Sequence, residues 1–135
     1  MRINAYLVFD GDCAAAFKRY HEIFGGEITA MLDHTAAPPG TPMPPNWGDR
    51  IMHACLEIDG TKLMGSDRPA GGHKAPEGMT VQVEVETPQE ADRVFAALSD
   101  GGKVTMPIAE TFWAHRFGAV TDRYGIPFMV NCGKF

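Results

Sequence analysis

The sequence predicts an α+β fold made of two βαβββ modules that form a curved mixed sheet with a cleft. Alternating apolar and polar residues indicate strands, and two stretches with apolar residues at three- and four-residue steps indicate helices. The same order of elements occurs twice. At 135 residues the chain is expected to form a single domain, with module 1 at about residues 1–67 and module 2 at about residues 79–132.

The first module is predicted to start with a strand at residues 3–9, which is rich in β-branched and aromatic residues. A helix is expected at residues 13–24, because large apolar residues recur on one face and Asp12 suits the N-cap position. Two glycines at 25–26 end this helix. A second strand then covers residues 27–32.

Residues 33–49 are predicted to form a long loop, because their five prolines suit neither a helix nor a central strand. Loops of this length often cover binding sites, and Met43 and Trp47 could provide apolar contacts to a ligand. The alternative is a surface excursion with the tryptophan packed against the body of the protein.

The strand predicted at residues 50–58 separates its side chains into two faces. One face is apolar and is expected to pack against the helix: Met52, Ala54, Leu56 and Ile58. The other is mixed and is expected to line a cavity: Ile51, His53, Cys55 and Glu57. A turn at 59–60 and a returning strand at 61–65 complete the module, and a Gly/Pro-rich loop spans residues 66–78.

The second module repeats this order. A strand is predicted at residues 79–86, a helix at 88–98 with its proline in the first turn, and a strand at 103–108. A polar and aromatic segment follows, and two closing strands are joined by a turn at 122–125. In the strand at 79–86, Thr80, Gln82 and Glu84 share the face that is not apolar.

Glycine pairs follow the helix in both modules, at 25–26 and at 101–102. One helix can cover only one face of each module's strands, so the other face must be buried elsewhere or line a cleft. The polar residues on that second face favour a cleft between the halves. The sequence therefore predicts a small-molecule site there.

His53 is the best single candidate for a catalytic residue, because an imidazole on a cavity face can act as a general base or a hydrogen-bond donor. The alternative is a structural histidine within the sheet. Cys55, Glu57 and Gln82 are predicted to contact the ligand from neighbouring positions. Cys55 is a weaker candidate as a nucleophile, because no residue close in sequence would lower its pKa.

The segment that begins at Glu110 adds Trp113, His115 and Arg116 within seven residues, and all three are predicted to bind the ligand. The guanidinium of Arg116 could hold a carboxylate or a phosphonate, and Trp113 could stack on a planar group. An anionic organic ligand is therefore among the expectations. The alternative pairs Arg116 with Glu110 and places the tryptophan in the core or in a subunit contact.

The composition narrows the expected partners. A net charge of −5 gives no broad basic surface, so neither nucleic acid nor an anionic membrane is expected to bind. No segment is apolar enough over about 20 residues to span a membrane. Three widely spaced cysteines suit neither a disulfide framework nor a structural zinc site, and they favour reduced thiols in the cytoplasm.

Several blocks resemble the vicinal oxygen chelate superfamily (glyoxalase, bleomycin resistance proteins and dioxygenases), and in particular its PhnB-like subfamily. They are Tyr6-Leu-Val-Phe-Asp-Gly11, Ile51-Met-His-Ala-Cys-Leu-Glu57, Leu63-Met-Gly-Ser-Asp67, Glu90-Ala-Asp-Arg-Val-Phe95, and Glu110-Thr-Phe-Trp113 through Asn131-Cys132. The resemblance covers nearly the whole chain. It implies a paired βαβββ fold, a ligand cleft and a homodimer.

In metal-dependent members of this superfamily, the first and last strands of each module supply His or Glu ligands. The resemblance places those positions near Ala5, Met64, Thr80 and Met129, none of which suits a hard metal ion. No metal and no other cofactor is therefore predicted. A relocated site built from His53, Glu57 and His115 is the alternative. Some PhnB-like proteins carry a methyltransferase label, but this sequence has no Rossmann-type cofactor motif.

Three functions remain open at this point. The first is binding of a small organic molecule, with metal-independent activity of unknown reaction type. The second is a lyase, isomerase or dioxygenase that uses a divalent ion at the relocated site. The third is sequestration of a ligand without any reaction, as the antibiotic-binding members of the superfamily do.

Overall fold

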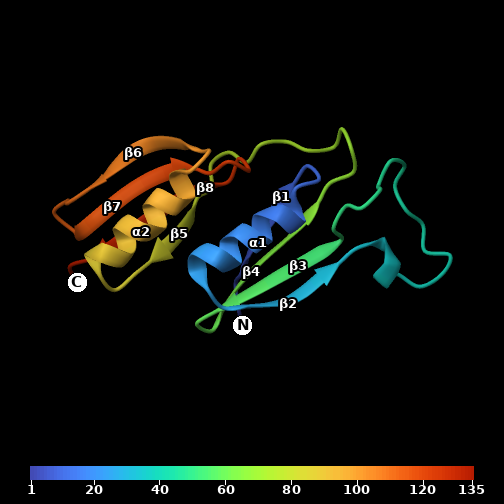
Figure 1. The fold of residues 1–135 in the computed structure, drawn as a ribbon, viewed down its shortest axis with the longest axis horizontal. Coiled ribbons are helices and arrows are strands. Elements are labelled where there is room, and N and C mark those ends of the chain that lie inside the picture. The colour runs from blue at the N-terminus through green and yellow to red at the C-terminus, as the bar shows by residue number, and fades with distance from the viewer. The chain divides into compact units, whose positions relative to one another are not determined.

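In the computed structural model, which describes residues 1–135, the chain is folded as two units, Met1–Lys74 and Ala75–Phe135 (Figure 1). Each unit contains one α-helix and one four-stranded mixed sheet. The predicted α+β class and the two βαβββ modules are confirmed. Their union into one domain with a shared cleft stays a prediction.

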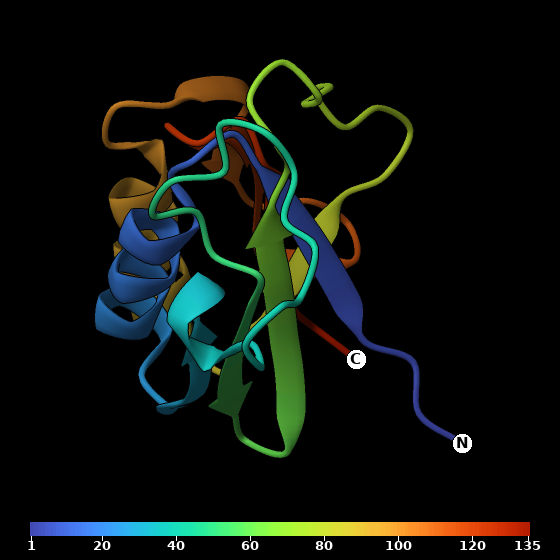
Figure 2. The ribbon, with the colours of Figure 1, turned by 90° about the vertical axis from the view of Figure 1, so that its right-hand side faces the viewer.

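Unit 1 carries its elements in the predicted order: β1 (Ala5–Phe9), α1 (Cys13–Phe24), β2 (Glu27–Leu32), a short 3-10 helix η1 (His34–Ala36), β3 (His53–Ile58) and β4 (Thr61–Asp67). The strand order is β1-β4-β3-β2. β1 runs parallel to β4, and the other neighbours are antiparallel. Helix α1 lies to one side of β3 and β4 and packs against that face of the sheet (Figure 2).

The core of unit 1 lies between α1 and this sheet. The ring of Phe17 on α1 meets the ring of Phe9 on β1 edge-on, with centroids 6.0 Å apart. Both side chains are fully buried, as are Ala54 and Leu56 on the apolar face that was predicted for β3. At the neighbouring position on β4, a Cβ atom on Gly65 would lie 2.9 Å from the Phe17 ring, so glycine lets the helix approach the sheet.

The strand predicted at residues 50–58 begins later, at His53. Ile51 was predicted to lie on the mixed face but is buried, and Met52 was predicted to face the helix but is exposed. The reason is that Ile51 exchanges hydrogen bonds with Asp67 at the end of β4. Its N–H donates to the Asp67 carboxylate at 2.7 Å, and its carbonyl accepts from the Asp67 N–H at 2.8 Å. A side chain thus replaces part of the backbone ladder, and the alternation of faces fails there.

Unit 2 contains β5 (Val81–Glu84), α2 (Pro88–Ser99), β6 (Lys103–Ala109), β7 (Ala114–Thr121) and β8 (Pro127–Gly133). The strand order is β5-β8-β7-β6, with β5 parallel to β8. Pro88 starts α2 as predicted, and the Thr87 side chain caps the helix by accepting from the Glu90 N–H at 3.1 Å. The strand predicted at 79–86 is shorter at both ends, and Met79 is exposed.

The two units share more than the order of their elements. A Cβ atom on Gly26 would lie 2.1 Å from the carbonyl oxygen of Glu57 on β3, and one on Gly102 would lie 2.5 Å from the carbonyl oxygen of Thr121 on β7. The second glycine of each pair therefore allows the same close backbone approach. Both helices have 12 residues, and neither is long and apolar enough to cross a membrane.

Candidate functional site

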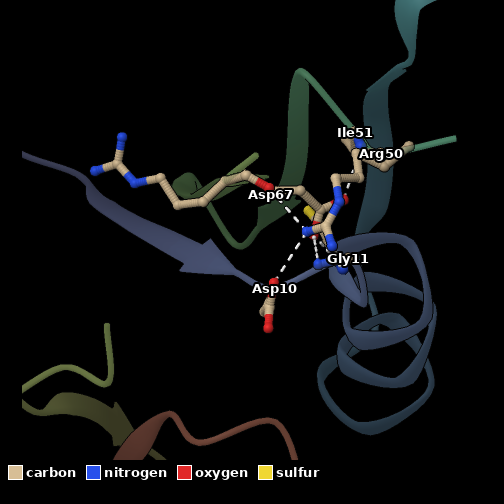
Figure 3. A network of polar contacts seen from close by, with 7 residues as sticks. Asp10, Gly11, Arg50, Ile51 and Asp67 are labelled. Atoms are coloured by element: carbon tan, nitrogen blue, oxygen red, sulfur yellow. Dashed lines mark hydrogen bonds and ion pairs between the residues drawn. The ribbon is translucent and has the colours of Figure 1, made fainter. Parts of the chain in front are cut away.

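The junction between β1 and α1 is fixed by a buried carboxylate (Figure 3). Asp67 is only 4% exposed, and its Oδ1 atom accepts from the N–H groups of Gly11 at 2.8 Å and Cys13 at 3.1 Å. Asp12 was predicted to cap α1, but its side chain makes no capping hydrogen bond. Asp67, at the end of β4, accepts these hydrogen bonds instead. Because Asp67 is more than 50 residues away in the sequence, the residues around the helix could not predict this cap.

Arg50 holds the outer side of the same junction (Figure 3). Its Nη1 atom donates to Oδ1 of Asp10 at 3.1 Å and to the carbonyl oxygen of Arg68 at 2.8 Å. The end of the β2–β3 connection is therefore attached both to the β1–α1 turn and to the residue after β4. These contacts are structural, and they hold the strands that carry the candidate site.

Cys13 lies at the start of α1 and is fully buried. Burial raises the pKa of its thiol from 9.0 to about 12, and the negative charges of Asp67 and Asp12 add to this effect. Only a thiolate reacts readily with alkylating agents. We therefore expect Cys13 to resist iodoacetamide at pH 8 in the native protein and to react in 6 M guanidinium chloride. Mass spectrometry of tryptic peptides measures this, and rapid native labelling of Cys13 would contradict it.

Tyr6 and His53 form a polar pair on the face of the unit 1 sheet opposite α1. The hydroxyl of Tyr6 lies 3.2 Å from Nδ1 of His53, and the two rings are stacked with centroids 5.8 Å apart. Tyr6 is 47% exposed and His53 is half-buried. The alternation in β3 predicted the side of His53. The partner could not be predicted from the sequence, because it depends on β4 lying between β1 and β3.

The surroundings of this pair are soft and weakly polar. One row of neighbours crosses the sheet from Tyr6 through Met64 to Cys55 and then Ala30. Cys55 lies on the predicted face, but its thiol is buried. Glu57 lies further along β3, where its carboxylate pairs with Lys62 at 3.6 Å. Of the three predicted residues on β3, His53 is the one hydrogen-bonded to a side chain from another strand of this face, that of Tyr6.

The open face of the unit 2 sheet carries a carboxylate held by two amides. Gln82 and Glu84 are exposed on β5, and Asn131 on β8 is the strand neighbour of Glu84. The amide nitrogen of Asn131 donates to both carboxylate oxygens of Glu84, at 2.9 and 3.1 Å. The amide of Gln82 donates to Oε2 at 3.3 Å. Gln82 was a predicted ligand residue, whereas the role of Asn131 was missed.

An aromatic cluster, defined as Phe112, Trp113 and Phe117, borders this face. The Trp113 ring lies edge-on to both phenylalanine rings, with centroids 4.8 Å from Phe112 and 5.3 Å from Phe117. Phe112 is 85% exposed and Trp113 is 39% exposed. Phe117 is the strand neighbour of Asn131, on the side away from Glu84. The predicted ligand residue Trp113 is therefore accessible and lies on an aromatic surface.

The structure places Arg116 and His115 differently from Trp113. Arg116 is bound to Asp92 on α2, with its Nη2 atom 2.7 Å from Oδ1, so its charge is already paired. The alternative partner, Glu110, pairs instead with Lys134 at 2.9 Å. The hydrogen bond and charge of Lys134 lower the pKa of Glu110, and His115 contributes a smaller effect in the same direction. His115 is exposed.

The four positions that the resemblance implied do not suit a hard metal ion. None of Ala5, Met64, Thr80 and Met129, the positions that the resemblance implied, offers an imidazole or a carboxylate. Within unit 1, His53 lies against Tyr6 and Glu57 pairs with Lys62. No group of three His, Cys, Asp or Glu side chains in the chain could hold an ion.

The sequence matches the Glyoxalase/Bleomycin resistance protein/Dioxygenase superfamily over residues 2–130. The chain belongs to this superfamily. It is 33% identical to Protein YjdN of Escherichia coli (strain K12), and the alignment covers 99% of the chain and 97% of YjdN.

Solved structures of the superfamily fold agree with this assignment. Protein PA1353 from Pseudomonas aeruginosa is 42% identical, with a TM-score of 0.90 and 98% of each chain covered. The PhnB protein from Bacillus cereus is 24% identical, with a TM-score of 0.80 over 98% of this chain and 100% of that protein. The resemblance inferred from the sequence blocks is thereby confirmed at the level of the superfamily and its fold.

Proposed function

We propose that this superfamily member binds a small organic molecule on the open face of the unit 1 sheet, with the Tyr6–His53 pair as its main polar contact. The hydrogen bond between the Tyr6 hydroxyl and Nδ1 of His53 carries the proposal. It orients an imidazole and a phenol on the sheet face opposite α1, where Tyr6 is 47% exposed and His53 is half-buried. Binding sites typically combine an apolar surface with a few oriented polar groups of this kind.

The pair can serve ligands of two kinds. If the Tyr6 hydroxyl donates to Nδ1, the neutral imidazole carries its proton on Nε2 and donates to the ligand. If Nδ1 donates to Tyr6, Nε2 becomes an acceptor and the hydroxyl is free to donate. No protein group bonds Nε2, so that atom is available in either state. Met64, the half-buried strand neighbour of Tyr6, suits an apolar, polarizable ligand body.

A ligand screen tests this proposal. Compounds that raise the melting temperature of the wild-type protein would be identified first, and their affinities would be measured by calorimetry. We expect His53→Ala to weaken binding of such a compound by about tenfold, because a hydrogen bond in a protected site is worth about 1.5 kcal/mol. Tyr6→Phe removes the orienting hydroxyl and should weaken binding by a smaller factor.

His34→Ala is the matched control, because His34 is an exposed histidine in the same unit but lies in η1, outside the sheet. It should bind the compound as the wild type does. Equal affinity of the His53→Ala and wild-type proteins, for every compound found, would contradict the proposed site.

Acid–base catalysis is a second candidate function, and the same hydrogen bond favours it. A hydrogen-bonded phenol and imidazole can exchange a proton with a bound substrate. Turnover that is lost in His53→Gln, while ligand affinity is retained, would support an enzyme. Retained binding without product, for both the wild type and the variant, would support sequestration.

A further inference from the structure

We infer that the open face of the unit 2 sheet is a second binding site, which accepts an organic cation: an ammonium group carried on an apolar or aromatic body. The site consists of Glu84, Asn131, Trp113 and Phe117. It goes beyond the proposed function, because it lies on the other unit and uses none of the residues on the unit 1 face.

The charge of Glu84 is the first argument. Its carboxylate is exposed and is held by two side-chain amides, and no lysine or arginine pairs with it. A carboxylate fixed in this way on a sheet face, without a protein cation, is prepared to accept hydrogen bonds from a cationic ligand.

The amide of Asn131 provides an independent argument. The residue is 8% exposed, and its Oδ1 atom is buried without any hydrogen-bond partner. The orientation is fixed, because only the nitrogen of the amide can donate to the Glu84 carboxylate. A buried acceptor without a partner costs free energy, and a ligand N–H that displaces a neighbouring side chain would remove that cost.

The aromatic cluster determines the kind of cation. Phe117 lies next to Asn131 on the same face, and Trp113 contacts Phe117. The Trp113 ring is partly exposed, and the faces of aromatic rings attract ammonium groups. Bare metal ions would gain little from these rings, whereas an ammonium on an apolar body would contact both the carboxylate and the aromatic surface.

Tryptophan fluorescence tests the inference directly. The chain has two tryptophans, Trp47 in unit 1 and Trp113 in unit 2, so Trp47→Phe leaves Trp113 as the only reporter. We expect a saturable change in its fluorescence on titration with phenethylammonium chloride. The neutral analogue 2-phenylethanol, at the same concentrations and ionic strength, should produce no saturable change.

Two further variants in the Trp47→Phe background separate the site from general electrostatics. Glu84→Gln keeps the size of the side chain and should raise the dissociation constant by about tenfold or more, since it removes the charge that the ammonium binds. Glu77→Gln changes the net charge equally in an exposed part of unit 2 outside the strands, and it should leave the constant within about twofold.

NMR of the Asn131 side-chain amide gives a readout at the site itself. Its two proton signals should shift with the same dissociation constant as the fluorescence. The inference is overturned if phenethylammonium gives no saturable change, if 2-phenylethanol binds equally well, or if Glu84→Gln, with native circular dichroism, has the dissociation constant of its parent.

Discussion

Replacing Asp67 with alanine is expected to destabilise unit 1 by about 3–5 kcal/mol, a large part of the stability of an ordinary domain. The substitution removes the acceptor for three N–H groups, those of Gly11, Cys13 and Ile51. Each buried donor without a partner costs about 1–3 kcal/mol. The start of α1 and the end of the β2–β3 connection lose their common anchor at the same time.

Urea denaturation of the Trp113→Phe background measures this effect, because Trp47 then reports on unit 1 alone. Asp10→Ala is the matched control: its carboxylate is exposed and pairs with Arg50, and losing it should cost less than about 1 kcal/mol. A change of less than 1 kcal/mol for Asp67→Ala would show that the network contributes little to stability.

Gly26→Ala is expected to destabilise unit 1 by about 3 kcal/mol or more. The backbone of Gly26 has a φ of 77°, and a Cβ atom there would lie 2.1 Å from the carbonyl oxygen of Glu57. The positive φ alone costs an L-residue about 1–2 kcal/mol, and the forced shift of β3 against α1 adds an overpacking cost of about 1–3 kcal/mol. Both effects act on the native state.

Gly60→Ala separates these two costs. Gly60 has a similar φ of 81°, but no atom lies within 4 Å of the position that its Cβ would occupy. This variant should therefore lose only about 1–2 kcal/mol, from the backbone conformation. Equal urea midpoints for Gly26→Ala and Gly60→Ala would show that the close approach of Gly26 to Glu57 does not add to the loss of stability.

The sequence predicted the fold through periodicity, and the same signal placed part of the candidate site. Alternation in β3 put His53, Cys55 and Glu57 on one face, and that alternation holds in the structure. It could not show that Cys55 is buried or that Glu57 is paired with Lys62, because those outcomes depend on neighbouring strands. The predicted alternation fails at Ile51 for the same reason, because the Asp67 side chain of β4 replaces its backbone hydrogen-bond partner.

The polar groups that matter most are those whose partners come from distant strands. Tyr6 meets His53 across β4, and Glu84 meets Asn131 across the parallel pair β5–β8. Parallel pairing of the first and last strands of a module leaves no local pattern in the sequence. The alternative for Arg116 shows the opposite case: the nearby acid, Glu110, suggested one ion pair, and helix α2 supplies another in Asp92.

The anchoring of Arg50 and Ile51 also bears on how freely the long β2–β3 connection can vary. Both of its ends are attached to the sheet, by β2 on one side and by the Asp67 network on the other. Lengthening such an excursion adds only a small closure entropy, about 0.6 kcal/mol for each doubling. Relatives can therefore acquire insertions or whole new lids between these two attachment points, and specificity can diversify there while the strands beneath keep their geometry.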